Sequence, residues 1–145
     1  MKKALLLTAV LTCTGAVAQE KEIWACQGTD TNGFIFRSGS WEKVFYTSQD
    51  FTLTLTATSA GLYSYTAIIN NLASDNIDVM FCNQQEEQSN FVGFLHCNLP
   101  SGDPNNLSLN KITGKAVRSD TLSYFDKVVD EGASIYLSLY QCTKF

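Results

Sequence analysis

The amino-acid sequence predicts an all-β fold, an antiparallel meander closed as a small barrel or stacked as a sandwich. Apolar and polar residues alternate with a period of two along much of the chain, which places side chains on alternate faces of strands. Turn-forming residues recur roughly every 10 to 12 positions, and strands do not alternate with helices. Short strands at this spacing are typical of antiparallel barrels and sandwiches.

The clearest strand covers residues 51–58, where Phe51, Leu53 and Leu55 share one face and the threonines share the other. A half-buried antiparallel strand requires this pattern. Similar alternation predicts strands at residues 23–27, 34–37, 41–46, 62–69, 77–82, 91–97 and 135–142. Turn residues predict connections at residues 31–33, 38–40, 60–61, 70–71 and 101–105.

One stretch departs from the period of two. Leu122, Phe125 and Val128 follow helical spacing, and Gly132 is placed to end a helix. A short helix near residues 121–131 is therefore an alternative to a loop.

The first eighteen residues have the three parts of an export signal: two lysines, an apolar run, and small residues before a cleavage point near Ala18. We therefore expect residues 1–18 to be a cleaved signal peptide and residues 19–145 to form a single disulfide-bonded β domain, periplasmic or secreted. The apolar run is well short of the roughly 20 residues that cross a bilayer, so no integral membrane association is expected. Lipid anchoring at Cys13 is disfavoured, because Thr12 replaces the small residue that lipoprotein processing requires.

Four cysteines remain in the expected mature chain, an even number that suits disulfides in an oxidising compartment. Four cysteines allow three pairings, and the spacing does not choose among them. We favour Cys26 with Cys142, because this bridge would join the first predicted strand to the last. Cys82 would then pair with Cys97 across an irregular loop, since a symmetric hairpin would place Cys82 opposite Phe91. The paired Cys-x-x-Cys spacing of zinc sites is absent, so we expect no metal site.

Composition restricts the partners. Without the signal peptide, 8 basic residues face 14 acidic ones, a net charge of about −6 that repels nucleic acid and suits a basic protein. His96 is the single histidine, and the sequence assigns it no nucleophile or carboxylate, so a hydrolase is a minor hypothesis. No cofactor is expected.

Aromatic residues offer the best binding candidates, because tyrosine on a sheet surface commonly contacts proteins or sugars. Tyrosine pairs lie two or four residues apart on predicted strands, and two glutamates lie in a polar loop. The candidate binding residues are Tyr63, Tyr65, Tyr136, Tyr140, Glu86 and Glu87.

The opening Trp24-Ala25-Cys26-Gln27-Gly28 and the closing Tyr140-Gln141-Cys142 resemble the ends of small exported proteobacterial proteins of unknown function. The aromatic-x-Cys start and the late cysteine are also similar to periplasmic inhibitors of C-type lysozyme, which are small exported β-barrels. That resemblance implies a barrel that binds and inhibits another protein.

The leading hypothesis is an exported, non-catalytic binding module, such as an inhibitor or immunity-type protein, that recognises a protein in the periplasm or outside the cell. One alternative is a small β-barrel carrier of an apolar ligand. A second is an envelope protein with a structural role.

Overall fold

The computed structural model describes residues 19–59, 61–84, 93–101, 105–121 and 130–145. Every regular element in these ranges is a β-strand, and they contain no helix. The helix predicted near residues 121–131 falls almost wholly on residues 122–129, which lie outside the described residues. The strands are β1 (Lys21–Arg37), β2 (Ser40–Phe45), β3 (Phe51–Ala57), β4 (Tyr65–Asn71), β5 (Ile77–Gln84), β6 (Phe94–Asn98), β7 (Asn106–Asn110), β8 (Lys115–Asp120) and β9 (Ser134–Lys144).

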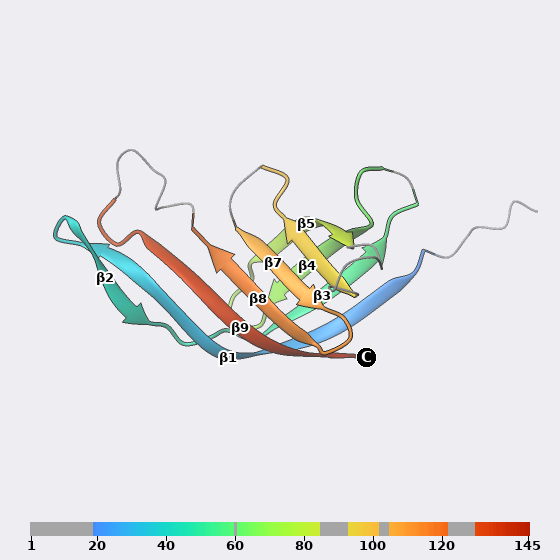
Figure 1. Ribbon diagram of the computed structural model, residues 1–145, viewed down its shortest axis with the longest axis horizontal. Coiled ribbons are helices and arrows are strands. Elements are labelled where there is room, and N and C mark those ends of the chain that lie inside the picture. Colours follow the sequence, from blue (N-terminus) through green and yellow to red (C-terminus); the bar gives the residue numbers. More distant parts are fainter. Residues whose placement is uncertain (1–18, 60, 85–92, 102–104, 122–129) are drawn as a thin grey trace, which may run out of the picture.

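The strands form one antiparallel sheet that closes on itself (Figure 1). From β3 to β9 each strand pairs with the next one along the chain, and β1 pairs with both β3 and β9. These pairings close a barrel of eight described strands, with β2 outside it. The predicted antiparallel meander is confirmed, and of its two alternatives the chain adopts the barrel.

The first strand is long enough to serve two structures. Residues 21–26 of β1 pair with β3 in the barrel wall, whereas residues 32–37 pair with β2. On its other edge β1 pairs with β9 over residues 24–35, and this pairing is interrupted by a bulge between Gly28 and Asp30. The β1–β2 hairpin and the start of β9 therefore project beyond the barrel (left of Figure 1), and we call this part the extension.

Three predictions about connections differ from the structure. The turn predicted at residues 31–33 is wrong, because these residues lie within β1, where Asn32 and Gly33 pair with both β2 and β9. The turn predicted at residues 70–71 falls at residues 72–73 instead, because Asn70 and Asn71 pair with β3 as the end of β4. No strand was predicted over β7 or β8, which both belong to the barrel wall. The turn at residues 38–40 is confirmed, and Gly39 there has a φ of 81°, a conformation that favours glycine.

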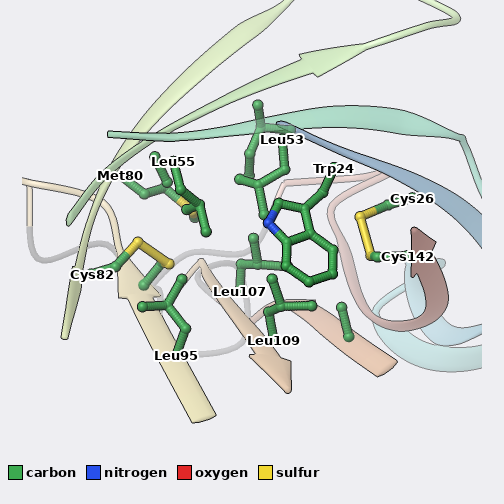
Figure 2. Close-up of a cluster of buried hydrophobic side chains, with 14 of the residues drawn as sticks. Trp24, Cys26, Leu53, Leu55, Met80, Cys82, Leu95, Leu107, Leu109 and Cys142 are labelled. Carbon is green, nitrogen blue, oxygen red and sulfur yellow. A yellow bond between two sulfur atoms is a disulfide. The ribbon is translucent and has the colours of Figure 1, made fainter. Parts of the chain in front are cut away.

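The barrel interior is packed with apolar side chains. Alternate residues of β3 point inward as predicted, with Phe51, Leu53 and Leu55 all buried. Figure 2 shows Trp24 among leucines from opposite walls, between the two disulfides. The core comprises Trp24, Cys26, Phe51, Leu53, Leu55, Ala67, Ile69, Met80, Cys82, Leu95, Cys97, Leu107, Leu109, Ala116, Tyr140 and Cys142.

The favoured disulfides, Cys26–Cys142 and Cys82–Cys97, are both present. Each joins residues that face each other across neighbouring strands, β1 with β9 and β5 with β6. The first bridge therefore fastens the seam where the first strand meets the last. Two disulfides fit an oxidising, extracytoplasmic location.

The barrel has two distinct ends. The connections after β2, β4, β6 and β8 lie at one end together with the extension, and we call this the pocket end. The start of β1, the β7–β8 turn and the C-terminus lie at the other, which we call the terminal end.

Candidate functional site

A cavity of about 220 Å³ lies at the pocket end, where the extension leaves the barrel. Its lining is mixed, with three tyrosine rings, several hydroxyl groups and one arginine. The lining residues are Thr31, Tyr46, Thr47, Ser48, Gln49, Asn71, Arg118, Ser134, Tyr136, Ser138 and Tyr140.

Strand β9 supplies one wall of the cavity. Its period of two points Tyr136, Ser138 and Tyr140 to the inside, whereas Leu137 and Leu139 face outward. Tyr140 is 7% exposed and belongs to both the core and the cavity, and its ring meets that of Phe51 edge to face at 4.8 Å. It therefore separates the cavity from the packed interior.

Tyr46, just after β2, contacts Tyr136 edge to face at the cavity wall, with ring centroids 6.4 Å apart and planes inclined by 64°. This arrangement depends on Gly33 in β1. A Cβ atom there would lie 2.2 Å from the Ile135 carbonyl oxygen and 2.9 Å from the Tyr46 ring. Gly33 therefore permits the extension to close over the cavity.

Hydroxyl groups form a chain across the cavity wall. Thr31, which is buried, donates a hydrogen bond of 2.8 Å to Ser138 Oγ, and its own Oγ1 lies 2.8 Å from Ser48 Oγ. Ser48 packs against Gly28, where a Cβ atom would lie only 2.1 Å from the Ser48 Cβ. The bulge in β1 thus turns Thr31 inward. The Thr31 hydroxyl then joins Ser138 on β9 to Ser48 in the segment between β2 and β3.

Arg118 is the buried cation of this end. It points inward from β8 with 8% of its surface exposed, and its Nη2 lies 2.7 Å from Asp78 Oδ2. Nη1 donates a longer hydrogen bond, 3.3 Å, to Asn71 Oδ1. Its Nε is buried and has no hydrogen-bond partner among the described residues. One of the three guanidinium nitrogen atoms is therefore left without a hydrogen-bond partner, in a residue that lines the cavity.

Burial raises the pKa of the Tyr136 phenol above its ordinary value of 10.0. Arg118 opposes this rise, whereas Asp120, Tyr140 and Asp78 add to it. Tyr136 therefore remains a protonated hydroxyl, able to donate a hydrogen bond, at any physiological pH.

Charge differs sharply between the two ends of the described structure. The pocket end, with the extension, carries eight acidic and three basic residues, whereas the terminal end carries two acidic and four basic ones. At the pocket end they are Asp30, Glu42, Asp50, Asp75, Asp78, Asp120, Asp130 and Glu131, with Arg37, Lys43 and Arg118. At the terminal end they are Glu20 and Glu22, with Lys21, Lys111, Lys115 and Lys144.

The predicted binding residues separate into different places. Tyr136 and Tyr140 line the cavity, whereas Tyr63 and Tyr65 lie at the terminal end. Tyr63 precedes β4 and stacks on Phe81 at 5.0 Å. Glu86 and Glu87 lie outside the described residues.

Tyr65 belongs instead to a buried ionic cluster. The Lys111 ammonium lies 4.6 Å from its ring centre and 2.8 Å from Glu22 Oε1, and Trp24 donates a hydrogen bond of 3.2 Å to Glu22 Oε2. Burial acts to raise the pKa of Glu22, but hydrogen bonds from Lys111 and Trp24 and the nearby ammonium charges outweigh it and lower that pKa. Lys144 adds a third contact at 3.3 Å.

His96 lies on the outer surface of β6, and its Nδ1 is 2.9 Å from Ser108 Oγ on β7. The residues that continue this cross-strand row on either side are Asn83 and Val117. Neither is a carboxylate that could orient the imidazole, as the third member of a hydrolytic triad does. The pair therefore forms a cross-strand contact on the wall, away from the cavity.

No protein-family model, curated protein or solved structure matches this chain. In the part of the chain that the structure describes, no group of three or more histidine, cysteine or acidic side chains is arranged to hold a metal ion. Those same ranges contain no helix long and apolar enough to cross a membrane.

Arg118, Tyr46 and the hydroxyl chain from Thr31 were not predicted from the sequence. These residues come from three separate parts of the chain, and only closure of the barrel brings them together. A usable signal was present for Arg118, since an arginine at an inward position of an alternating segment requires a buried partner.

Proposed function

We propose that this protein is an exported, non-catalytic binding module that recognises a basic protein at its pocket end. The observation that carries the proposal is the charge asymmetry, because among the described residues the acidic excess surrounds the cavity and the extension and does not continue to the terminal end. Acidic surfaces of this kind steer basic partners and set specificity. The cleaved signal at residues 1–18 would deliver the domain to the periplasm or the exterior, where its disulfides are stable.

The extension supplies the contact surface. Its register places Phe34, Phe45 and Leu137 on the same outward face, and these side chains are 42%, 76% and 47% exposed. Lys43 lies on that face beside Phe45. Exposed aromatic residues are enriched in protein interfaces and supply much of their binding energy. Acidic side chains around an aromatic patch match a partner with a basic rim and an apolar centre.

The packed core favours this function over the carrier of an apolar ligand. The inward residues of β3 fill the barrel, and the cavity at the pocket end is small and lined by many polar groups. Carriers enclose larger, mainly apolar pockets of about 300–1,000 Å³. A purely structural role in the envelope would leave the charge asymmetry without a purpose.

The test uses the purified chain from residue 19, immobilised and exposed to periplasmic extract and to purified basic cell-wall hydrolases. We expect a basic protein to bind and to be released as salt rises, because screening weakens the attraction. The variant Glu42→Gln/Asp75→Asn/Asp130→Asn removes three exposed charges at the pocket end and should weaken binding about tenfold or more. Binding that is unaffected by both salt and this variant would contradict the proposal.

A matched control separates local from overall charge. Glu20→Gln removes one exposed charge at the terminal end, and Asp75→Asn removes one at the pocket end. We expect only Asp75→Asn to slow association. Equal effects would mean that net charge, and not the pocket end, determines binding.

A further inference from the structure

We propose that the cavity at the pocket end binds one neutral saccharide ring, held by Arg118 and by the tyrosines that line the cavity. This binding site goes beyond recognition of a protein and does not depend on it. The inference rests on the size of the cavity, the charges around it, the unused donor of Arg118 and the pairing of aromatic rings with hydroxyl groups.

The size of the cavity limits the ligand to a small one. A volume of about 220 Å³ lies below the roughly 300–1,000 Å³ of pockets that take drug-sized ligands. It is also several times the roughly 30 Å³ that one water molecule occupies in the liquid. A single sugar ring falls between these limits, and Tyr140 prevents a longer ligand from entering the core.

The charges select a neutral ligand. Asp78 lies 2.7 Å from Arg118 and offsets its charge, so the guanidinium acts as a fixed donor rather than as an anion site. An anion would also approach through the acidic pocket end. A cation inside the cavity would lie against the guanidinium. A neutral ligand with oxygen acceptors is repelled neither by the acidic residues of the pocket end nor by the Arg118 guanidinium.

The unused donor gives the ligand a point of attachment. A buried donor without a partner is destabilising, and more so when its group is charged, so such atoms are rare in folded proteins. Arg118 Nε is such a donor, in a side chain that lines the cavity and is held by Asp78 and Asn71. Nε has almost no accessible surface of its own, so the proposed bound state includes a small shift of the guanidinium that lets a sugar hydroxyl or ring oxygen accept its hydrogen.

Aromatic rings and hydroxyl groups complete the match. Tyr46 and Tyr136 present apolar ring surfaces for the C–H face of a sugar. The Tyr136 hydroxyl can bond the sugar's edge, whereas the Tyr46 hydroxyl donates a long hydrogen bond of 3.4 Å to the Phe34 carbonyl oxygen and can accept one from the sugar. Ser134 and Thr47 add further hydroxyl groups at the cavity wall. An apolar ligand would leave most of these groups without partners.

The test is a titration of the purified chain, labelled with ¹⁵N, with neutral sugars: glucose, galactose, mannose and N-acetylglucosamine. Glucuronate and glucosamine provide an anionic and a cationic counterpart. Sugars are added to about 50 mM, well above the ~1 mM Kd expected of a weak site for one ring. We expect at least one neutral sugar to shift the Nε–H resonance of Arg118 and the backbone resonances of Tyr136 and Ser138, and to bind more tightly than its charged counterpart.

Two variants with matched controls locate the site. Ser134→Phe places a ring in the cavity and should abolish the shifts, whereas Thr143→Phe, on the outer surface of the same strand near the terminal end, should not. Tyr136→Phe removes one hydroxyl and should weaken binding about three- to tenfold, whereas Tyr63→Phe should leave it unchanged.

Three results would overturn the inference: no neutral sugar shifts Arg118 Nε–H, a charged counterpart binds more tightly than its neutral parent, or Ser134→Phe leaves the shifts in place. All of these measurements use the purified chain alone. Their failure would therefore leave the proposed recognition of a basic protein unaffected, and the absence of a protein partner would leave the saccharide result unaffected.

Discussion

Glu22 is the residue whose replacement most directly tests how the terminal end is stabilised. It is 5% exposed, and its carboxylate accepts hydrogen bonds from Lys111, Lys144 and Trp24. Glu22→Gln preserves the shape of the side chain but leaves the half-buried ammonium of Lys111 without its counter-charge.

The expected loss of stability follows from these contacts. Removing one member of a buried ion pair typically costs about 3–5 kcal/mol. The Lys111 side chain is 16% exposed and also contacts the Tyr65 hydroxyl, so part of its charge remains solvated. We therefore expect a loss of about 2–3 kcal/mol, or a fall in Tm of roughly 5–12 °C for a domain of this size.

Urea denaturation of three variants measures the effect. Glu20→Gln, an exposed neighbour two residues away, serves as the matched control and should change stability by less than about 0.5 kcal/mol. Glu22→Gln/Lys111→Met removes both charges and should recover at least half of the loss. A Glu22→Gln chain as stable as the control, or a double variant no better than the single one, would refute the reasoning.

The pKa directions add a dependence on pH. The pKa of Glu22 is lowered below its ordinary 4.5, so its stabilisation is complete above that value and disappears as the pH falls through the depressed folded pKa. The pKa of Lys111 is raised above 10.5, because bonds to Glu22 and Tyr65 outweigh the opposing effect of burial. Its contribution is complete below 10.5 and is lost as the pH rises through the folded pKa. Glu22→Gln should therefore flatten the acid limb of the stability curve.

Three further predictions concern the rest of the barrel. Gly33→Ala should cost about 2–4 kcal/mol in thermal unfolding, because its Cβ would meet the Ile135 carbonyl at 2.2 Å, whereas Asn32→Ala should cost little. Replacing both cysteines of the β1–β9 bridge by serine should cost about 4.8 kcal/mol, against about 3.0 for the β5–β6 bridge, because the bridges span 116 and 15 residues. Equal losses would contradict the chain-entropy account. In an ultraviolet titration Tyr136 should ionise above the ordinary phenol value of 10.0, because burial raises its pKa, and Tyr136→Phe should remove that step.

Most strands with one buried face were predictable, although β7, with Leu107 and Leu109 buried, was not. Such burial produces the alternation of β3, and it placed Tyr136 and Tyr140 on one face of β9, which lines the cavity. Strands β7 and β8 are short, and β8 turns Arg118 inward, so its pattern is not simply apolar. Arg118 occupies an inward position of β8 where an apolar residue would be expected, so the residue proposed to bind the ligand also interrupts the apolar alternation of its strand.

Gly33 illustrates why the part of the cavity formed by the extension was not predictable from the sequence. Asn32-Gly33 has the composition of a turn, yet it lies in the middle of β1, since Gly33 is needed for the close approach of Tyr46 and of the β9 backbone. Turn propensity is local, whereas this requirement comes from Ile135, about a hundred positions later. Barrel closure alone brings these residues together.

The two ends of the barrel use similar chemistry for different purposes. Each holds one cation against one carboxylate, the half-buried Lys111 with Glu22 and the buried Arg118 with Asp78. The Glu22 carboxylate accepts bonds at both oxygens, and we expect that cluster to contribute to stability. Arg118 retains a donor that no described residue accepts, beside a cavity lined by hydroxyl groups. Replacements around Glu22 should therefore change stability and leave binding intact, whereas those at the cavity rim should change binding at little cost in stability.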